Sequence, residues 1–186
     1  MHVKTNWIVL VRYFVAALVA CLLCTGPSQA QREKHEPLTA AEIEEIRDAG
    51  IVPEQRVNLY TKYLGEHADA LKALAARRKS AARADALDEQ IQNLTALLDE
   101  TGSNLDVYSD HHADIRKSLK KLTEAMPHLL EILKALPVEH AYDLSLKEAL
   151  ESYQDLSTQA DQMLKEQTEY FKLHKDEKNQ ERAEPK

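Results

Sequence analysis

The chain has 186 residues, of which 24 are lysine or arginine and 31 are aspartate or glutamate, for a formal net charge of −7. This length suits one domain or two small ones. The first thirty residues hold two basic residues, Lys4 and Arg12, and no acidic one, so the remainder carries a net charge of −9. Nucleic acids and anionic lipids are bound through clustered lysine and arginine, and this balance therefore disfavours both as partners.

Residues 1–30 have the layout of a secretory signal peptide. The apolar stretch at 13–24 follows Lys4 and Arg12 and is too short to span a bilayer as a helix. Small residues at Ser28 and Ala30 stand at the positions that signal peptidase reads. We therefore predict cleavage after Ala30.

Two alternatives at this end of the chain involve the membrane. An anchor formed by residues 8–23 is disfavoured, because Arg12 would lie in the hydrocarbon. Residues 18–21 look like a lipobox, which would make Cys21 a lipidated first residue. Because Cys21 and Cys24 are the two cysteines of the chain, the protein after either cleavage is expected to contain no disulfide and no cysteine-bound metal.

Turn-forming residues then divide the chain into helical segments. Thr39 and Glu42 have the spacing of a capping box at the start of a short helix, and Gly50 is expected to follow its end. Pro53 suits the first turn of the next helix, which an apolar stripe places at residues 54–79.

The clearest element is a 4-3 repeat of apolar residues from Leu87 to Leu136, in which thirteen of fifteen core positions are apolar or tyrosine. A strict seven-residue repeat is typical of helices packed with a slight left-handed supercoil. The repeat keeps its phase through Gly102, and we therefore predict one long helix, bent near Pro127 and ended by Pro137.

The last helix is expected at residues 144–174. With a flexible leader at 31–37 and a disordered polar tail at 175–186, the helical domain spans 38–174. The predicted fold class is all-α: an elongated antiparallel helical bundle, or coiled-coil-like hairpins around one long central helix. Each apolar stripe must be covered by another, either in this chain or in a second copy.

Polar side chains crowd together after residue 102. Three carboxylates there stand four residues apart, which makes them neighbours on a helix, and a histidine is within reach of the same ion. The candidate ligands of this weak cation site are Asp106, Asp110, His111 and Asp114. The alternative is a solvated acidic face that pairs with Arg116 and Lys117.

Thr101 and His112 are polar residues at core positions of the repeat. We expect both to be hydrogen-bonded core residues that specify the register of packing, as asparagine does in coiled coils. His67 lies near the inner edge of its stripe and is expected to face the long helix. The alternative for His67 and His112 is a pH-sensitive switch.

The remaining aromatic and basic residues have structural interpretations. Most tyrosines fall on the inward stripes and are expected in the core. The basic residues of the turn are expected to be solvated, with an acidic partner as the alternative; they are Arg77, Arg78, Lys79 and Arg83. The sequence contains no Glu-x-x-His, CxxCH, HExxH or Gly-x-Ser-x-Gly motif and no phosphate-binding glycine loop. We therefore predict no catalytic residue, no cofactor and no enzyme activity.

Three blocks of sequence resemble a group of exported helical proteins of unknown function from Gram-negative bacteria. They are residues 54–60 (EQRVNLY), 104–108 (NLDVY) and 112–117 (HADIRK). This resemblance covers most of the chain after the signal and implies no activity. Residues 38–42 (LTAAE) are similar to the LTxxQ element of small helical periplasmic chaperones and metal-stress proteins, with Glu42 in place of the glutamine.

These observations predict an exported, non-enzymatic helical protein that binds or scaffolds in the cell envelope, in the periplasm or secreted. Its expected partner is a protein or a second copy of the chain. Nucleic acid is not expected as a partner, nor membrane insertion after signal cleavage, although a lipid anchor at Cys21 is the minority alternative. The alternative function is a periplasmic chaperone or metal-stress protein with a weak cation site near Asp110 and Asp114.

Overall fold

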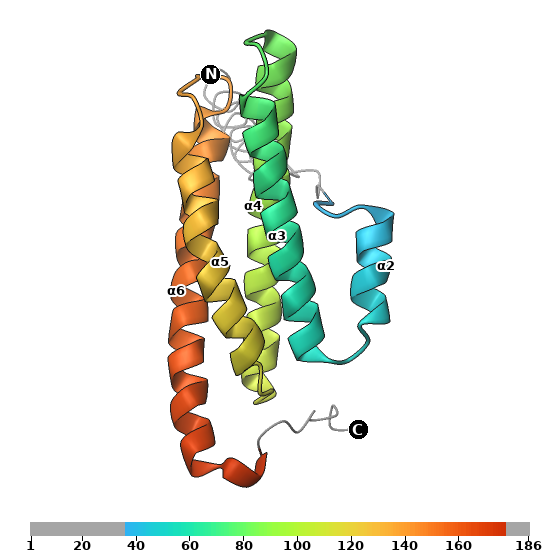
Figure 1. Cartoon of the computed structure of the whole chain (residues 1–186), viewed down its shortest axis with the longest axis vertical. Coiled ribbons are helices and arrows are strands. Elements are labelled where there is room, and N and C mark those ends of the chain that lie inside the picture. Colours follow the sequence, from blue (N-terminus) through green and yellow to red (C-terminus); the bar gives the residue numbers. More distant parts are fainter. Residues whose placement is uncertain (1–35, 178–186) are drawn as a thin grey trace, which may run out of the picture. The chain divides into compact units, whose positions relative to one another are not determined.

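The computed structural model describes residues 36–177, and this part of the chain is all-α with no strand (Figure 1). The helices are α2 (Ala40–Asp48), α3 (Pro53–Ala75), α4 (Ala81–Asp110), α5 (Arg116–Ala135) and α6 (Asp143–Leu173), followed by the 3-10 turn η1 (Lys175–Glu177). The predicted all-α bundle is confirmed. The predicted signal peptide, both cysteines, nearly all of the leader and most of the tail lie outside the described residues. Within the described part, no helix is both long enough and apolar enough to cross a membrane.

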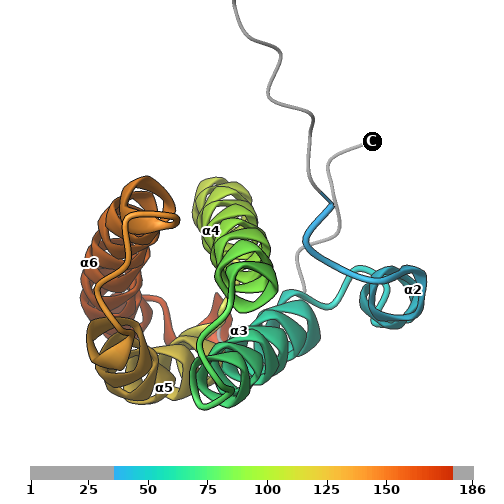
Figure 2. The same ribbon diagram turned by 90° about the horizontal axis from the view of Figure 1, so that it is seen from above.

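Four helices form the bundle, and each contacts two neighbours. The neighbouring pairs are α3–α4, α4–α6, α6–α5 and α5–α3 (Figure 2). The consecutive helices α4 and α5 do not contact each other, so they lie across the diagonal of the bundle. The link between them, residues 111–115, therefore crosses the end of the bundle instead of joining neighbours.

The predicted single helix from Leu87 to Leu136 is wrong. Helix α4 is continuous through Gly102, as expected, but it ends at Asp110, and α5 begins at Arg116. The repeat did not reveal this break because each helix is amphipathic by itself and the link preserves the spacing between them. Helix α5 continues through Pro127 to Ala135.

The core consists of the apolar stripes of all four bundle helices, packed against one another as one cluster. Every position of the 4-3 repeat is buried except His112. Full burial of a leucine or isoleucine side chain stabilises a fold by about 1.5–3 kcal/mol. The stripes are thus covered within one chain, and the bundle does not need a second copy to bury them.

The turns follow the local signals in the sequence. The Thr39 hydroxyl accepts a hydrogen bond from the Glu42 N–H at 3.3 Å, and the Thr39 N–H donates to the Glu42 carboxylate at 2.6 Å, so the predicted capping box is confirmed. Gly50 follows the C-cap with φ of +61°, a conformation that glycine adopts without steric cost. Pro53 is the first residue of α3. These residues reverse the direction of the chain, so that α3 runs back along α2.

The interpretation of the basic turn as solvated is wrong for Arg83. Its side chain is buried, forms an ion pair with the carboxylate of Glu139 and donates to the carbonyl oxygen of Ala75 at 3.2 Å. Arg77 and Arg78 are exposed. The buried pair joins the α3–α4 turn to the segment between α5 and α6.

Gly65 lies inside α3, where an added Cβ would meet no atom within 4 Å. Alanine restricts the unfolded chain more than glycine does, so we expect Gly65→Ala to raise the free energy of unfolding by about 0.5–1 kcal/mol. Urea denaturation measures this change. Gly102→Ala is the matched control and should gain less, because its Cβ would stand 3.0 Å from the Gln159 side chain. A loss of stability in Gly65→Ala would contradict the expectation.

Candidate functional site

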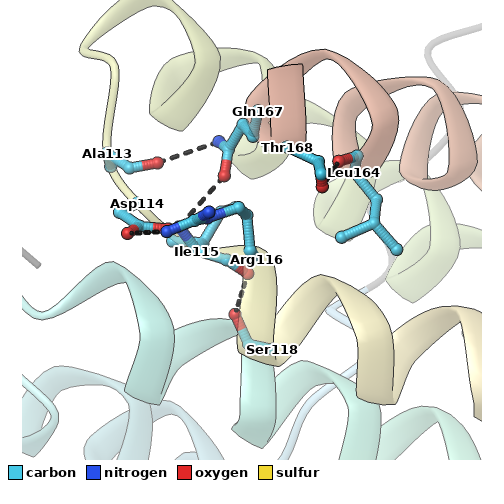
Figure 3. A network of polar contacts seen from close by, with 8 residues as sticks. All are labelled: Ala113, Asp114, Ile115, Arg116, Ser118, Leu164, Gln167 and Thr168. Carbon is cyan, nitrogen blue, oxygen red and sulfur yellow. Dashed lines mark hydrogen bonds and ion pairs between the residues drawn. The ribbon is translucent and has the colours of Figure 1, made fainter. Parts of the chain in front are cut away.

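The link between α4 and α5 is stabilised by one side chain of α6 (Figure 3). The Gln167 side-chain oxygen accepts a hydrogen bond from the Ile115 N–H at 3.1 Å, and its NH₂ group donates to the Ala113 carbonyl at 2.8 Å. Gln167 is itself buried. A single amide therefore satisfies two backbone groups of a segment that has no regular secondary structure.

Arg116 closes the same link on its other side. Its Nε and Nη2 donate to the two carboxylate oxygens of Asp114 at 2.7 and 2.8 Å, and its guanidinium lies 4.7 Å from the centre of the Phe171 ring. The hydrogen bond to Asp114 raises the pKa of Arg116 above its ordinary value. These contacts indicate a structural role for Arg116 and Asp114. Each balances the charge of the other, and the Phe171 ring also interacts with the guanidinium.

The four candidate cation ligands do not come together as a site. Asp106 accepts a hydrogen bond from Gln159 at 2.6 Å, and Asp114 is paired with Arg116. Asp110 and His111 lie at the end of α4. In residues 36–177, no three histidine, cysteine or carboxylate side chains are grouped so that they could hold a metal ion.

His112 is exposed, so its assignment to the core is wrong. The break in the helix gives it φ of +51°, and its ring stacks on Tyr170 at a centroid distance of 5.2 Å. Thr101 is fully buried, as predicted, and its hydroxyl donates to the Leu97 carbonyl within α4 at 2.7 Å. This bond lies within one helix and does not specify the register between helices.

His67 faces α4, where its Nδ1 lies 2.9 Å from Nε2 of Gln90. Burial lowers the pKa of His67. Its hydrogen-bond partner is thus on α4, whereas His112 stacks on α6, and no partner shared by the two histidines appears in the described residues. The geometry gives no support to a switch that uses both histidines.

A chain of polar contacts connects α3 and α4. The Tyr108 hydroxyl donates to Oδ1 of Asn104 at 3.4 Å, Nδ2 of Asn104 donates to the Tyr60 hydroxyl at 3.2 Å, and that hydroxyl donates to Glu100 at 2.9 Å. Burial and then the Glu100 carboxylate raise the pKa of Tyr60. The chain of contacts therefore ends on the Glu100 carboxylate, and the Tyr60 hydroxyl that donates to it stays protonated.

Arg56 stands beside these tyrosines without a carboxylate partner. The side chain is half-buried, its Nε is buried and has no hydrogen-bond acceptor, and no described acid lies within 4.0 Å of its guanidinium. Burial raises the pKa of Tyr60 and of Tyr108, and the charge of Arg56 opposes this rise in both; for Tyr60, a side-chain hydrogen bond with Arg56 opposes it as well. Among the described residues, Arg56 is thus a half-buried cation that contacts a tyrosine hydroxyl and no carboxylate.

Arg56 lines a groove of about 400 Å³ between α2 and the bundle. The bundle contributes Arg56, Tyr60 and Glu100 to it. The opposite side is formed by α2 and the residues next to it, mainly by apolar side chains, namely Leu38, Ile43 and Ile46. The groove thus combines an apolar wall with a floor that carries the Arg56 cation and the Glu100 carboxylate.

Glu45 joins α2 to α3, because it accepts hydrogen bonds from the Tyr63 hydroxyl at 2.6 Å and from Lys62. These bonds, the one from Tyr63 first, lower the pKa of Glu45. Its carboxylate therefore favours docking above the ordinary glutamate pKa of about 4.3, and this contribution is lost as the pH falls through the lowered pKa. NMR shifts of α2 amides and of the Tyr63 ring, followed from pH 7 to 2, should show this transition.

Glu45→Gln should remove that transition, since the amide does not titrate. Glu44→Gln is the matched control, because Glu44 pairs with Arg47 within α2 and should leave the transition in place. A transition of equal size in all three proteins would show that Glu45 does not control the docking of α2.

No role was predicted for Arg56, Glu100 or Asn104 from the sequence, although a signal was present. Glu100, Asn104 and Tyr108 stand four residues apart on α4, beside its apolar stripe, as Arg56 and Tyr60 do on α3. Four of these five residues also lie in two of the sequence blocks that carried the resemblance described above.

The chain was compared with protein-family models, with curated proteins and with solved structures, and none of them matches it.

Proposed function

We propose that this chain is an exported, non-enzymatic binding protein of the cell envelope that holds a ligand in the groove between α2 and the bundle. The observation that carries the proposal is the half-buried charge of Arg56, which faces two tyrosines and a groove instead of a carboxylate. An anionic ligand in the groove would supply the missing partner.

The composition of the groove supports binding over scaffolding. Ligand pockets are usually lined by apolar side chains with a few convergent polar groups, and their volumes are about 300–1,000 Å³. The groove, at about 400 Å³, has this character. A scaffold built by self-association would need exposed apolar stripes, whereas here the bundle helices cover their stripes within one chain.

Export is part of the proposal and rests on residues 1–30. Mass spectrometry of the processed amino terminus tests it separately. We expect a chain that starts at Gln31. A chain that retains Met1 would contradict export, and a lipidated Cys21 would replace the soluble form with an anchored one.

Native mass spectrometry of the protein, purified without denaturation from the cells that produce it, tests binding. We expect the wild-type chain to carry a noncovalent ligand that is absent from Arg56→Gln. Arg78→Gln is the matched control, because Arg78 is exposed and does not line the groove. Equal spectra of the wild type and Arg56→Gln, with both proteins folded, would contradict the proposal.

A further inference from the structure

The charges around the groove favour a ligand with a single negative charge. Arg56 is a cation of its floor with no carboxylate within 4.0 Å among the described residues, while Glu100, which accepts a hydrogen bond from Tyr60, is a carboxylate of the same floor. Arg47 lines the groove too, but it is paired with Glu44. Glu100 repels any anion in this groove, and a dianion such as a phosphate monoester about twice as strongly as a monoanion, so a monoanion suits the single cation Arg56 better.

Guanidinium pairs well with carboxylate, because its planar fork of N–H groups matches the two oxygens. The Nε of Arg56 is buried, so the ligand would be bound by the terminal nitrogens of the guanidinium. A ligand carboxylate bound to Arg56 would lie on the side of the groove that Tyr60 lines. The hydroxyls of Tyr60 and Tyr108 already donate to Glu100 and Asn104, so the N–H groups of Arg56 that are not bonded to Tyr60 are the donors for the ligand.

The opposite wall determines the rest of the ligand. Leu38, Ile43 and Ile46 present aliphatic side chains to the groove. In the first turn of α3, the N–H groups of Gln55 and Arg56 both donate to the Val52 carbonyl. Among the described residues, this turn thus offers no row of free backbone groups of the kind that a peptide backbone would need. An aliphatic chain needs none.

We propose that the ligand is a small aliphatic monocarboxylate, with its carboxylate on Arg56 and its hydrocarbon chain against Leu38, Ile43 and Ile46. This inference rests on the proposed function, since it names the class of ligand that the groove binds. The volume of about 400 Å³ suits a free molecule of this kind.

Isothermal titration calorimetry of the exported chain with octanoate tests whether the charge of Arg56 binds the carboxylate. Octanoate should bind the wild type and Arg78→Gln alike. Arg56→Gln should bind it about tenfold to a hundredfold more weakly, because a hydrogen-bonded charge pair is lost. Arg56→Lys, which keeps the charge, should bind with intermediate affinity. Octanamide has nearly the same shape but no charge, and it should bind the wild type as weakly as octanoate binds Arg56→Gln. Circular dichroism of each variant confirms that it is folded.

Ile43→Asn tests the apolar wall and should weaken octanoate binding without preventing folding, since Ile43 is only partly buried. Equal binding of octanoate and octanamide would overturn the proposal, as would tighter binding of a short apolar peptide with a free carboxyl end. If octanoate does not bind although native mass spectrometry shows an Arg56-dependent ligand, the ligand class is wrong and the binding function stands. If neither experiment shows a ligand, both proposals fail.

Discussion

Replacement of Arg83 by alanine is expected to lower the free energy of unfolding by about 3–5 kcal/mol. The side chains of Arg83 and Glu139 are only 5% and 10% exposed, and each is the principal charge partner of the other. Without Arg83, the Glu139 carboxylate would stay buried, with Lys79 at 3.9 Å as its nearest cation. The loss is large because a buried charge without a partner costs more than the pair contributes.

Guanidinium denaturation with a fixed m-value measures this loss. Arg78→Ala, in the same turn but exposed, should stay within about 0.5 kcal/mol of the wild type. The double replacement Arg83→Met with Glu139→Leu removes both charges and should recover much of the stability. If Arg83→Ala behaves like Arg78→Ala, the ion pair is not a major stabilising contact.

Gln167→Ala is expected to destabilise the bundle by about 2–4 kcal/mol. The Ile115 N–H and the Ala113 carbonyl would both lose their hydrogen-bond partner, and each unsatisfied buried group costs about 1–3 kcal/mol. Part of this cost is recovered if water enters the cavity that the shorter side chain leaves. The α4–α5 link would lose the contact that joins it to α6.

Two measurements separate this local role from a general loss of helix stability. Denaturation gives the free energy, and hydrogen exchange of the Ile115 amide reports on the link itself. Gln162→Ala, on the same helix, is the control, since Gln162 is exposed and bonds only to Glu166 among the described residues. An unchanged Ile115 exchange rate in Gln167→Ala would contradict the role given to this amide.

The sequence predicted the helices well where the signals were local. The capping box at Thr39, the turn at Gly50 and the first turn at Pro53 each depend on a few consecutive residues, and each forms as expected. The 4-3 repeat identified the buried face of α4 and of α5 because burial follows the helical period.

The break at residues 111–115 was missed because no glycine or proline marks it. Helix α4 ends in a Schellman motif, in which the His112 N–H donates to the Ser109 carbonyl and the Ala113 N–H to the Tyr108 carbonyl. The Ile115 N–H and the Ala113 carbonyl are then bound by Gln167, more than fifty residues later in the chain. His112 then adopts a left-handed conformation that histidine tolerates better than most residues. A pattern within one helix carries no information about such a partner.

The groove was missed for a similar reason. Arg56 and Glu100 belong to different helices, and the aliphatic wall comes from α2 and from Leu38, two residues before it. Arg56 has no acidic partner among the described residues. The sequence does not show this, because the surroundings of Arg56 are known only once α2, α3 and α4 are placed. The buried Arg83 pair likewise needed the segment between α5 and α6 to reach the α3–α4 turn.

Hydrogen exchange of the chain, isolated without denaturation, tests most directly whether this groove is a binding site. The same sample is measured again after it has been unfolded in guanidinium, dialysed and refolded, which removes noncovalent ligands. We predict that residues 40–60, the α2 side of the groove and the turn of α3 that carries Arg56, exchange more slowly before this treatment, while α5 is unchanged. Identical exchange of residues 40–60 before and after would contradict a ligand in the groove.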